Sequence, residues 1–366
     1  MTTKSSLSEK LRKQVETEGS LSVEQWMAAC LADPDDGYYM TRDPFGRSGD
    51  FITAPEISQM FGELLGLWSA VMWQSMGAPA EVRLVELGPG RGTLMADALR
   101  AANSLPSFID AVSVHMVETS PVLKVSQQNK LANARCSVDW HDSLETVPDG
   151  PMIVLANEFL DALPVQQWIF HNGQWFQRMV GHDGEAFVFA IGDPVDPEDV
   201  PYFLSGAAEG AIFETSPVVS RVIETLARRL HTDIGAALLI DYGHTKRGAG
   251  ETLQALKGHQ FADPLQNPGE QDLTAHVDFA YVAEIAKRAG AGVWGPLPQG
   301  ALLERMGIAA RATRLLLNAS KQQAEDIATA RHRLVDDGAM GRLFKAVALT
   351  HPELAAPPGF EGSLAD

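Results

Sequence analysis

Polar side chains stand at the ends of five short apolar runs that follow one another along the chain. Each run is predicted to be a strand, and the polar residues at or just beyond the ends are Glu86, Glu118, Asp142, Asn157 and Asp241. In open α/β sheets, ligands bind at the carboxyl ends of the strands. Carboxylate and amide oxygens at such an edge accept hydrogen bonds and attract cations. The five residues therefore predict a site for a ligand that carries positive charge and hydroxyl groups.

A glycine-rich turn follows the first of these strands. Residues 85–92 read VELGPGRG, which places glycine at Gly88, Gly90 and Gly92. Glycine adopts positive φ readily and lets a ligand approach the backbone closely. A dinucleotide fingerprint is spaced Gly-x-Gly-x-x-Gly, and a P-loop continues with Lys-Ser/Thr; here Thr93 stands where the third glycine would fall. With Glu86, the turn resembles the first motif of class I S-adenosylmethionine (SAM) methyltransferases. A dinucleotide site and an ordinary strand-to-helix turn are the alternatives.

Two further strand ends extend the SAM hypothesis. Glu118 follows the second strand, where a carboxylate can accept hydrogen bonds from both hydroxyls of a ribose. Asp142 and Ser143 follow the third strand, in the region where such enzymes bind the adenine edge, and Trp140 is a candidate stacking neighbour. The alternative for Asp142 and Ser143 is the N-cap of a helix, a position that favours both residue types.

The composition narrows the class of protein and its partners. The formal net charge is -18, from 47 acidic and 29 basic residues. Such a field repels phosphate backbones and attracts basic ligands, which argues against nucleic acid and fits a protein that presents arginine or lysine. An acidic surface that merely aids solubility is the plainer interpretation. The ten histidines show no helical His-x-x-x-His pair and no Cys/His cluster, so we predict no metal.

The same features bear on location. No stretch has the roughly 18 uninterrupted apolar residues of a membrane span, so we expect no membrane insertion. The first 20 residues lack an apolar signal-peptide core, and the chain has only two cysteines, Cys30 and Cys136. Few cysteines agree with a reducing compartment. These features together predict a cytoplasmic protein; its oligomeric state stays open, with a homodimer as one candidate.

Hydrophobic periodicity predicts an α/β fold with a doubly wound parallel sheet. Short apolar runs alternate with helical segments from Arg83 onward, the pattern of a parallel sheet with crossover helices. We expect a core over residues 81–351 and a tail over 352–366. Within the core, a β-rich insertion is expected at about 165–215, because its aromatics alternate around the turn signal Asn172-Gly173. Residues 1–80 are expected to be mainly helical, with one helix over 5–32 and another that Thr53 caps.

Six blocks in order along the chain resemble the MidA-type family of SAM-dependent methyltransferases. They are GDFITAPEISQMFGELLGLW, LVELGPGRGTLM, ANEFLDALPV, LIDYGH, DLTAHVDF and MGRLFKAVAL. Mitochondrial relatives in this family are complex I assembly factors that dimethylate an arginine on a core subunit. The resemblance implies a class I (Rossmann-like) methyltransferase core, a helical N-terminal lid, SAM as cofactor and a protein arginine as acceptor. By position it puts Phe51 and Thr53 near the cofactor mouth, the Glu86–Gly92 turn and Glu118 on SAM, and the NEFLD block at the acceptor.

The acceptor chemistry then selects candidate catalytic residues. A guanidinium is a poor nucleophile because its lone pair is delocalised and its pKa exceeds about 12. A carboxylate that binds it bidentately fixes its plane and can accept the proton after transfer. Glu158 is the first candidate and Asp161 the second, with Asn157 as an orienting acceptor and His276 as a candidate proton relay.

Purely structural roles are the alternatives for these candidate catalytic residues. The NEFLD acids could lie at the start of a helix, near its positive end, and His276 could pack in the core. The polar loop over residues 42–51, with Gly46 and Gly49, is expected to close over the site. For the whole protein, a non-catalytic SAM-binding assembly factor and an NAD-linked oxidoreductase are the alternative functions.

Overall fold

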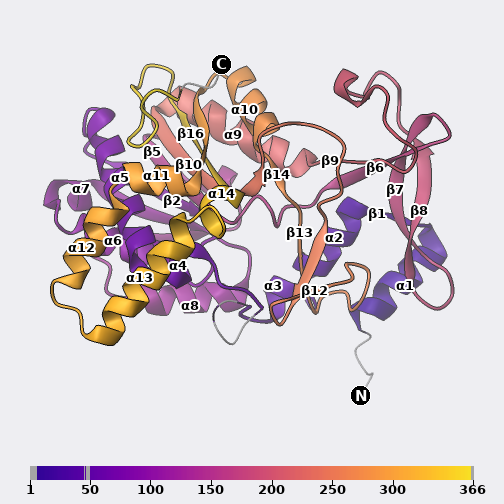
Figure 1. The fold of residues 1–366 in the computed structure, drawn as a ribbon, viewed down its shortest axis with the longest axis horizontal. Coiled ribbons are helices and arrows are strands. Elements are labelled where there is room, and N and C mark those ends of the chain that lie inside the picture. The colour runs from indigo at the N-terminus through magenta and orange to yellow at the C-terminus, as the bar shows by residue number, and fades with distance from the viewer. Residues whose placement is uncertain (1–5, 45, 47–49, 364–366) are drawn as a thin grey trace. The chain divides into compact units, whose positions relative to one another are not determined.

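A computed structural model of the chain describes residues 6–44, 46 and 50–363. The chain forms two compact units, each built from three segments, and we describe each by itself (Figure 1). Unit 1 comprises Met1–Phe51, Asp161–Ser220 and Lys246–Asp278, and unit 2 comprises Ile52–Leu160, Arg221–Thr245 and Phe279–Asp366. This division differs from the expected one. Residues 52–80 belong with the core, whereas the first 51 residues belong with the β-rich insertion.

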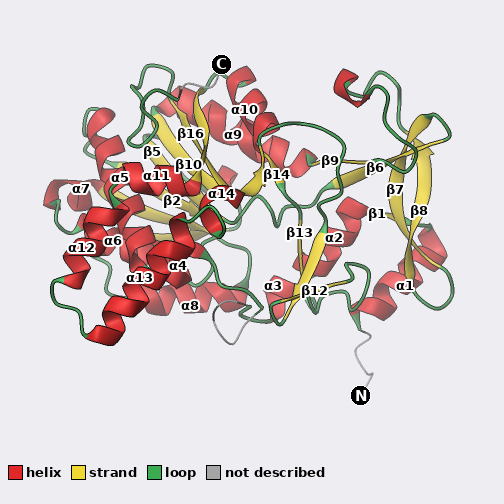
Figure 2. Ribbon diagram, viewed as in Figure 1, coloured by secondary structure: helices red, strands yellow, loops and turns green. Residues whose placement is uncertain are grey.

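A parallel sheet with two antiparallel strands at one edge forms the centre of unit 2 (Figure 2). Its strand order is β15-β16-β10-β5-β2-β3-β4. The strands are β2 (Val82–Leu87), β3 (Val112–Val117), β4 (Val138–His141), β5 (Met152–Asn157), β10 (Gly235–His244), β15 (Gly292–Pro298) and β16 (Phe344–Thr350). From β4 to β10 neighbouring strands run parallel, and β16 pairs antiparallel with both β10 and β15. The predicted parallel sheet is thus confirmed.

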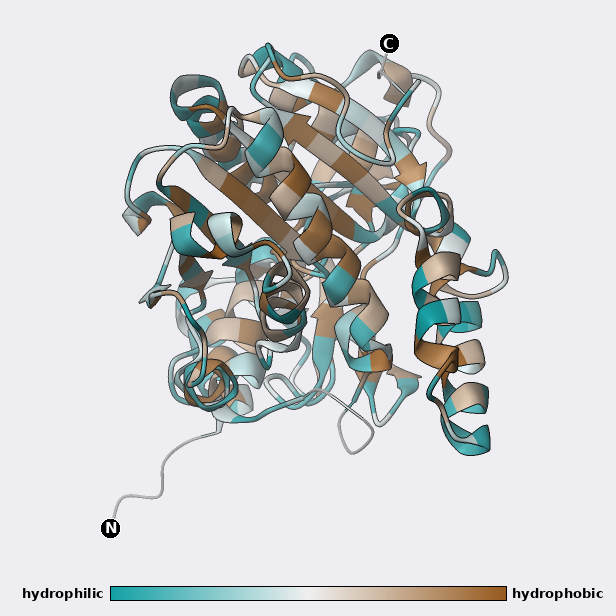
Figure 3. Cartoon of the chain, turned by 90° about the vertical axis from the view of Figure 1, so that its left-hand side faces the viewer, coloured by the Kyte–Doolittle hydropathy of each residue, from teal (hydrophilic) through white to brown (hydrophobic). Residues whose placement is uncertain are grey.

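The central strands of this sheet are buried on both faces. Every residue of β5 is buried, as are four successive residues at the end of β2. Parallel strands covered on both faces read as continuous apolar runs, which is how β5 reads in the sequence. Figure 3 shows the strands mostly in the hydrophobic colour, with hydrophilic residues on the outer surfaces of the helices.

Helices α5 and α6 pack closely on one another because α5 carries glycine at the contact. A Cβ at Gly66 would lie 2.4 Å from the carbonyl oxygen of Ala98, and one at Gly62 would lie 2.7 Å from Cβ of Asp97. Side chains of α5, α6, α11 and α12 share one apolar cluster with alternate residues of β2, β5 and β10. The helices of unit 2 are α4 (Ala54–Ile57), α5 (Gln59–Ser75), α6 (Thr93–Ala102), α7 (Pro106–Ala111), α8 (Pro121–Leu131), α10 (Phe279–Arg288), α11 (Gln299–Arg305), α12 (Ile308–Leu316), α13 (Lys321–Val335), α14 (Met340–Leu343) and the 3₁₀ turn η1 (Leu144–Thr146), while α9 (Pro217–Asp233) begins in unit 1.

The predicted helix over residues 5–32 is interrupted. Gly19 has φ 96°, a conformation that ends a helix and that glycine adopts readily. The segment consists of α1 (Leu7–Glu18), the two-residue strand β1 (Leu21–Ser22) and α2 (Val23–Ala32). Ser22 caps α2 through a capping box with Gln25. Likewise, the helix expected from Thr53 breaks after α4, and the side chain of Ser58 caps α5.

Unit 1 is built on a five-stranded antiparallel sheet. It runs β1-β7-β6-β9, with β8 paired to β7. The turn between β6 and β7 has φ 50° at Asn172 and 82° at Gly173, so the predicted hairpin is confirmed. Its elements are β6 (Gln166–His171), β7 (Gln174–His182), β8 (Phe187–Pro194), β9 (Ile212–Thr215), α3 (Tyr38–Thr41), η2 (Tyr202–Leu204), β14 (Val277–Asp278) and a three-stranded sheet of β11 (Gln254–Lys257), β12 (Gln260–Ala262) and β13 (Asp272–Thr274). Across the described residues, no helix has the length and apolarity needed to cross a membrane.

Candidate active site

The glycine turn connects β2 to α6 through three residues with positive φ. The φ angles are 63° at Gly88, 52° at Gly90 and 77° at Gly92. A Cβ at Gly88 would lie 2.8 Å from the ring of Phe159, and one at Gly92 would lie 3.3 Å from Cγ of Gln127. Packing within the protein therefore accounts for two of the glycines. Gly90 lies between them with its carbonyl hydrogen-bonded to Nε2 of Gln127 at 2.7 Å, and its positive φ is itself a conformation that favours glycine.

Glu118 follows β3 and is held by a neighbour that the sequence did not reveal. One carboxylate oxygen accepts the amide of Ser120 at 2.8 Å, and the other accepts Nε2 of Gln127 at 3.1 Å. Burial raises the pKa of Glu118, and the Ser120 and Gln127 hydrogen bonds oppose that rise. Gln127 is fully buried on α8, together with Leu123 and Leu131. These three residues are four positions apart, so the sequence places a polar side chain on the apolar face of the helix. That pattern could have identified Gln127 as a buried functional residue.

Two buried acceptor oxygens lie at the ends of adjacent strands. Oε2 of Glu86 and Oδ1 of Asn157 are buried without a hydrogen-bond partner among the residues that the structure describes. Glu86 is 3% exposed in β2, and β2 pairs with β5, which ends at Asn157. Burial, and then the charge of Glu118, raises the pKa of Glu86 well above its usual range. A ligand with a cationic donor would relieve both features, because it supplies hydrogen bonds and positive charge.

SAM fits these residues by chemistry. Its amino group is a cationic donor, which matches the buried acceptors of Glu86 and Asn157. Its ribose hydroxyls match the carboxylate of Glu118. The turn at Gly90 leaves the backbone without a side chain where the amino-acid part would pass.

Glu158 begins a turn and not the helix considered as the alternative. Its φ is 51°, an uncommon conformation for a residue with a side chain, of the kind that persists at functional sites. One carboxylate oxygen accepts the amide of Ala54 at 2.9 Å and the side-chain amide of Asn157 at 3.0 Å. Its own amide donates to the carbonyl of Ile240 at 2.9 Å. The side chain therefore has a fixed place at the end of β5.

Asp241 holds the same turn from the neighbouring strand. It is 1% exposed within β10, one residue beyond the stretch that pairs with β5, and one of its carboxylate oxygens accepts the amides of Phe159 at 3.1 Å and Leu160 at 2.9 Å. The other oxygen accepts the amide of Tyr242 at 2.9 Å. Although the sequence placed Asp241 among the strand-end carboxylates, it indicated no role. The structure shows that it anchors the turn that carries Glu158.

The other predicted site residues of unit 2 are Asp142, Ser143 and Thr53, and they differ in exposure. The Asp142 side chain is 80% exposed and forms an ion pair of 2.6 Å with Lys124, which lowers the pKa of the carboxyl. Ser143 precedes η1 but makes no side-chain cap, so the N-cap alternative receives no support from its hydroxyl. Thr53 is buried at the start of α4, where its carbonyl accepts the amides of Glu56 and Ile57.

Three of the predicted site residues belong to unit 1. Asp161 is buried, and its carbonyl accepts the amide of Ala275 at 3.0 Å. Burial, and then the negative charge of Asp161, raises the pKa of Asp272 to about 8. The Asp272 carboxylate accepts a hydrogen bond from the Tyr39 hydroxyl at 2.8 Å. The amide of His276 donates to the Thr252 hydroxyl at 2.9 Å.

Phe51 packs beside the apolar core of unit 1. Phe51 is the last residue of the loop over residues 42–51, which is expected to close over the site. Four residues of that loop, Phe45, Arg47, Ser48 and Gly49, lie outside the described residues.

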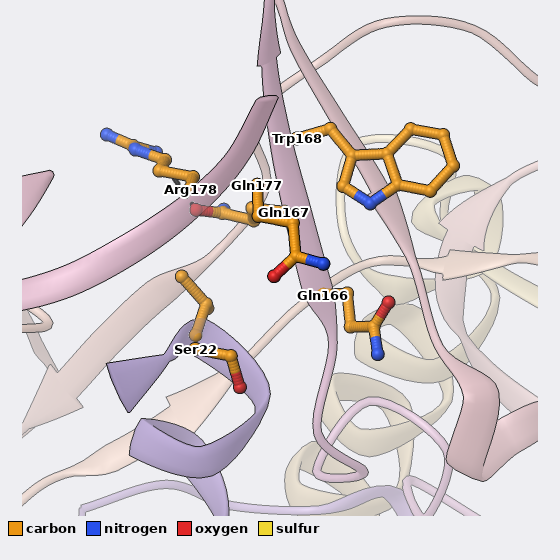
Figure 4. A pocket seen from close by; sticks show the side chains of 7 residues that line it. Ser22, Gln166, Gln167, Trp168, Gln177 and Arg178 are labelled. Atoms are coloured by element: carbon orange, nitrogen blue, oxygen red, sulfur yellow. Dashed lines mark hydrogen bonds between the residues drawn. The ribbon is translucent and has the colours of Figure 1, made fainter. Parts of the chain in front are cut away.

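A small cavity in unit 1 is separate from all the predicted site residues. Its volume is about 30 Å³, and Figure 4 shows the side chains of Gln166, Gln167, Trp168 and Arg178 around it. Arg178 donates to Gln167 at 2.9 Å and to Glu251 at 2.5 Å, and Gln166 donates to Glu24 at 2.6 Å. Ligand pockets for drug-sized molecules measure roughly 300–1,000 Å³. This cavity has room for water only.

The doubly wound sheet, the glycine turn after β2 and the carboxylate after β3 define a class I SAM-dependent methyltransferase. Residues 64–297 match the model of a family described as S-adenosyl-L-methionine-dependent methyltransferases, and the chain belongs to that family. The resemblance noted in the sequence is thus confirmed, and SAM is the family's cofactor. Membership also sets aside the NAD-linked oxidoreductase.

The chain is similar over most of its length to curated relatives. It is 37% identical to the "Protein arginine methyltransferase NDUFAF7 homolog, mitochondrial" of Drosophila melanogaster, over 96% of this chain and 86% of the relative. It is 33% identical to the human "Protein arginine methyltransferase NDUFAF7, mitochondrial", over 93% of this chain and 82% of the relative. The fold is also similar to the crystal structure of a protein from Burkholderia thailandensis bound to S-adenosyl-homocysteine, with a TM-score of 0.85 and 29% sequence identity. The match covers 98% of this chain and 95% of the Burkholderia chain.

The relatives correct one prediction. They are named mitochondrial, so the predicted cytoplasmic location is wrong. The prediction used the N-terminal composition and the low cysteine count, which test for the secretory route and do not separate the cytoplasm from a mitochondrion. The absence of a metal stays a prediction; within the described residues, no group of three or more His, Cys, Asp or Glu side chains is placed to hold an ion.

Proposed function

We propose that the protein transfers a methyl group from SAM to an arginine side chain of another protein. One observation carries the acceptor assignment: the Glu158 carboxylate is fixed at the end of β5, in a strained conformation, by Ala54 and Asn157. Its relatives are named protein arginine methyltransferases. The net charge of -18 favours a basic protein as the acceptor.

The cofactor residues are proposed from the chemistry of their side chains. Glu118 accepts the ribose hydroxyls, and Glu86 with the Gly90 turn receives the amino-acid part. The turn residues Gly88 and Gly92 shape that backbone. Asp142 and Ser143 contact the adenine edge, and Phe51 and Thr53 line the mouth. When bound, SAM supplies a methyl group on a sulfonium that is ready to leave.

Glu158 orients the acceptor and receives its proton. A carboxylate bound to two nitrogens of a guanidinium fixes the plane of the group and concentrates the charge away from the reacting nitrogen. Because one oxygen of Glu158 is held by Ala54 and Asn157, the carboxylate keeps its orientation without a cost in side-chain entropy at each turnover. Asn157 thus acts through Glu158. Asp161 is the second carboxylate that binds the acceptor guanidinium, and His276 relays the proton.

The family resemblance also suggests which protein carries the acceptor arginine. A respiratory complex I subunit, methylated in support of complex assembly, is the candidate. A homodimer is the candidate oligomeric state, which light scattering of the purified protein tests.

The test compares Glu158→Gln with Glu81→Gln. Glutamine keeps the oxygen that Ala54 and Asn157 contact, but it places an NH2 group where the second acceptor oxygen stood. S-adenosyl-homocysteine affinity should therefore survive in Glu158→Gln, while transfer from labelled SAM to protein falls by about 10²–10⁴, the usual range for a positioned proton-transfer group. Glu81 is exposed just before β2, at the opposite end of the strand, so its variant should behave as wild type.

Each outcome has a definite meaning. Full transfer by a folded Glu158→Gln protein contradicts the role of Glu158. Substitution of the labelled acceptor arginine by lysine should abolish labelling, because an ammonium cannot form the planar bidentate pair. A wild-type protein that binds S-adenosyl-homocysteine but labels no polypeptide in an extract from its own organism supports the non-catalytic assembly factor.

A further inference from the structure

Gln127 connects three parts of the cofactor site. Its Nε2 donates to the Gly90 carbonyl at 2.7 Å and to the Glu118 carboxylate at 3.1 Å, and its Oε1 accepts Nε1 of Trp140 at 2.9 Å. The side chain is 0% exposed. All the hydrogen-bonding groups of the amide are thus used inside the protein: two N–H donors and one carbonyl.

The orientation of the amide follows from Trp140. An indole N–H can only donate, so the atom of Gln127 that faces it must be the oxygen. The NH2 group must then face Gly90 and Glu118, both of which offer acceptor oxygens. The Glu118 carboxylate also receives the amide of Ser120 on its other oxygen. With a donor on each oxygen, the carboxylate cannot rotate freely about its last bond, and the acceptor capacity left for a ligand has one fixed direction.

We propose that Gln127 is a positioning residue that makes the cofactor site selective for an intact ribose diol. The proposal rests on the assignment of Glu118 to the ribose hydroxyls. Gln127 fixes Glu118 and the Gly90 carbonyl relative to each other, so the part of the site that receives the ribose and the part that receives the amino acid keep one spacing. The side chain also accounts for Gly92, since a Cβ there would lie 3.3 Å from Cγ of Gln127.

A purely structural role for Gln127 makes different predictions. A buried residue that only fills space would lower the affinity for every ligand alike when it is replaced. A positioning residue changes the difference between ligands, because loss of its hydrogen bond frees Glu118 to rotate. The distinguishing measurement is therefore a comparison of two ligands on the same variant.

The experiment titrates S-adenosyl-homocysteine and its 3′-deoxy analogue into the intact protein by calorimetry. We expect wild type to bind the deoxy analogue roughly 10- to 100-fold more weakly, the range for one hydrogen bond to a charged group. Gln127→Met keeps length and burial but removes the amide, so its discrimination should shrink to a few-fold. Gln128→Met is the matched control, because Gln128 is the next residue of α8 and is exposed; it should discriminate as wild type does.

Two further variants keep the proposal testable if Gln127→Met is poorly folded. Trp140→Phe removes the donor that orients the amide and should give intermediate discrimination. Gln127→Glu preserves volume but sets an oxygen against the Gly90 carbonyl and Glu118, so it should bind S-adenosyl-homocysteine more weakly than Gln127→Met does. Because a buried carboxylate opposite two acceptors weakens binding under either role, the ratio of the two ligand affinities, and not their absolute order, separates positioning from packing in this variant.

The result that overturns the proposal is a Gln127→Met protein whose discrimination equals that of wild type, whatever its absolute affinity. Failure of the Glu118 assignment looks different: wild type itself would then bind the two ligands equally, and the proposal for Gln127 would fall with it. Neither result depends on transfer to an acceptor, so the acceptor assignment is tested separately.

Discussion

Substitution of Gly88 by alanine tests whether the glycine turn and the Glu158 turn support one another. At φ 63°, alanine is strained by its backbone, and its Cβ would lie 2.8 Å from Cδ2 of Phe159. Gly77 provides a control with the first effect alone. Its φ is 85°, and a Cβ there would have no other atom within 4 Å.

The two variants differ by an amount that can be worked from these contacts. A left-handed conformation costs an L-residue roughly 1–2 kcal/mol, which is the whole loss expected for Gly77→Ala. Overlap with a packed side chain adds roughly 1–3 kcal/mol, so Gly88→Ala should lose roughly 2–5 kcal/mol. The assay is urea unfolding followed by circular dichroism, with the free energy of unfolding extrapolated to water.

Functional consequences should follow the same difference. Because Phe159 directly follows Glu158, a displaced ring should disturb the acceptor turn, and methyl transfer should fall in Gly88→Ala but not in Gly77→Ala. Equal losses of stability in the two variants would refute the reasoning. That result would mean that the half-buried ring of Phe159 moves aside without cost and that the two turns are independent.

Two predictions concern pH. Because burial and the charge of Glu118 raise the pKa of Glu86 well above the usual 4.5 of a glutamate, its proton is bound more tightly in the folded state. The free energy of unfolding should therefore fall as pH rises from about 4.5 through the folded pKa; Glu86→Gln should lose this slope in urea titrations, and an unchanged slope would contradict it. Burial and then His141 lower the pKa of His115 from 6.5 to about 4. Its contribution is present above pH 6.5 and is lost as pH falls toward 4, by roughly 3 kcal/mol; His115→Gln should flatten this acid limb, and an unchanged limb would count against the assignment.

Local patterns were sufficient for the elements that carry the cofactor site. The parallel strands are buried on both faces, so each reads as an apolar run, and the polar residue where each run ends was identifiable. β5 illustrates this, since it ends at Asn157, one of the polar residues expected at a strand end. The Asn172-Gly173 hairpin was also readable, because those residue types adopt positive φ most easily.

Local patterns failed where a single residue overrides periodicity. Gly19 ends α1 within a stretch whose apolar spacing suggested one continuous helix. The same is true after α4, where Ser58, and not Thr53, provides the side-chain cap of the longer helix. Such breaks depend on one cap or one φ angle, whereas periodicity averages over a window of residues.

By itself, the sequence determined the class of the fold, the family and the kind of ligand, because these follow from short-range order: an apolar run, a carboxylate, a glycine turn. Tertiary structure decided which residues hold that chemistry in place. Gln127 differs from Gln128 only in the face of α8 on which it lies, and Asp241 contacts Phe159 and Leu160 of the Glu158 turn across 82 and 81 residues of chain. The grouping of Met1–Phe51 with the β-rich insertion was equally hidden. Contacts between distant segments depend on how whole elements pack, and no local pattern records them.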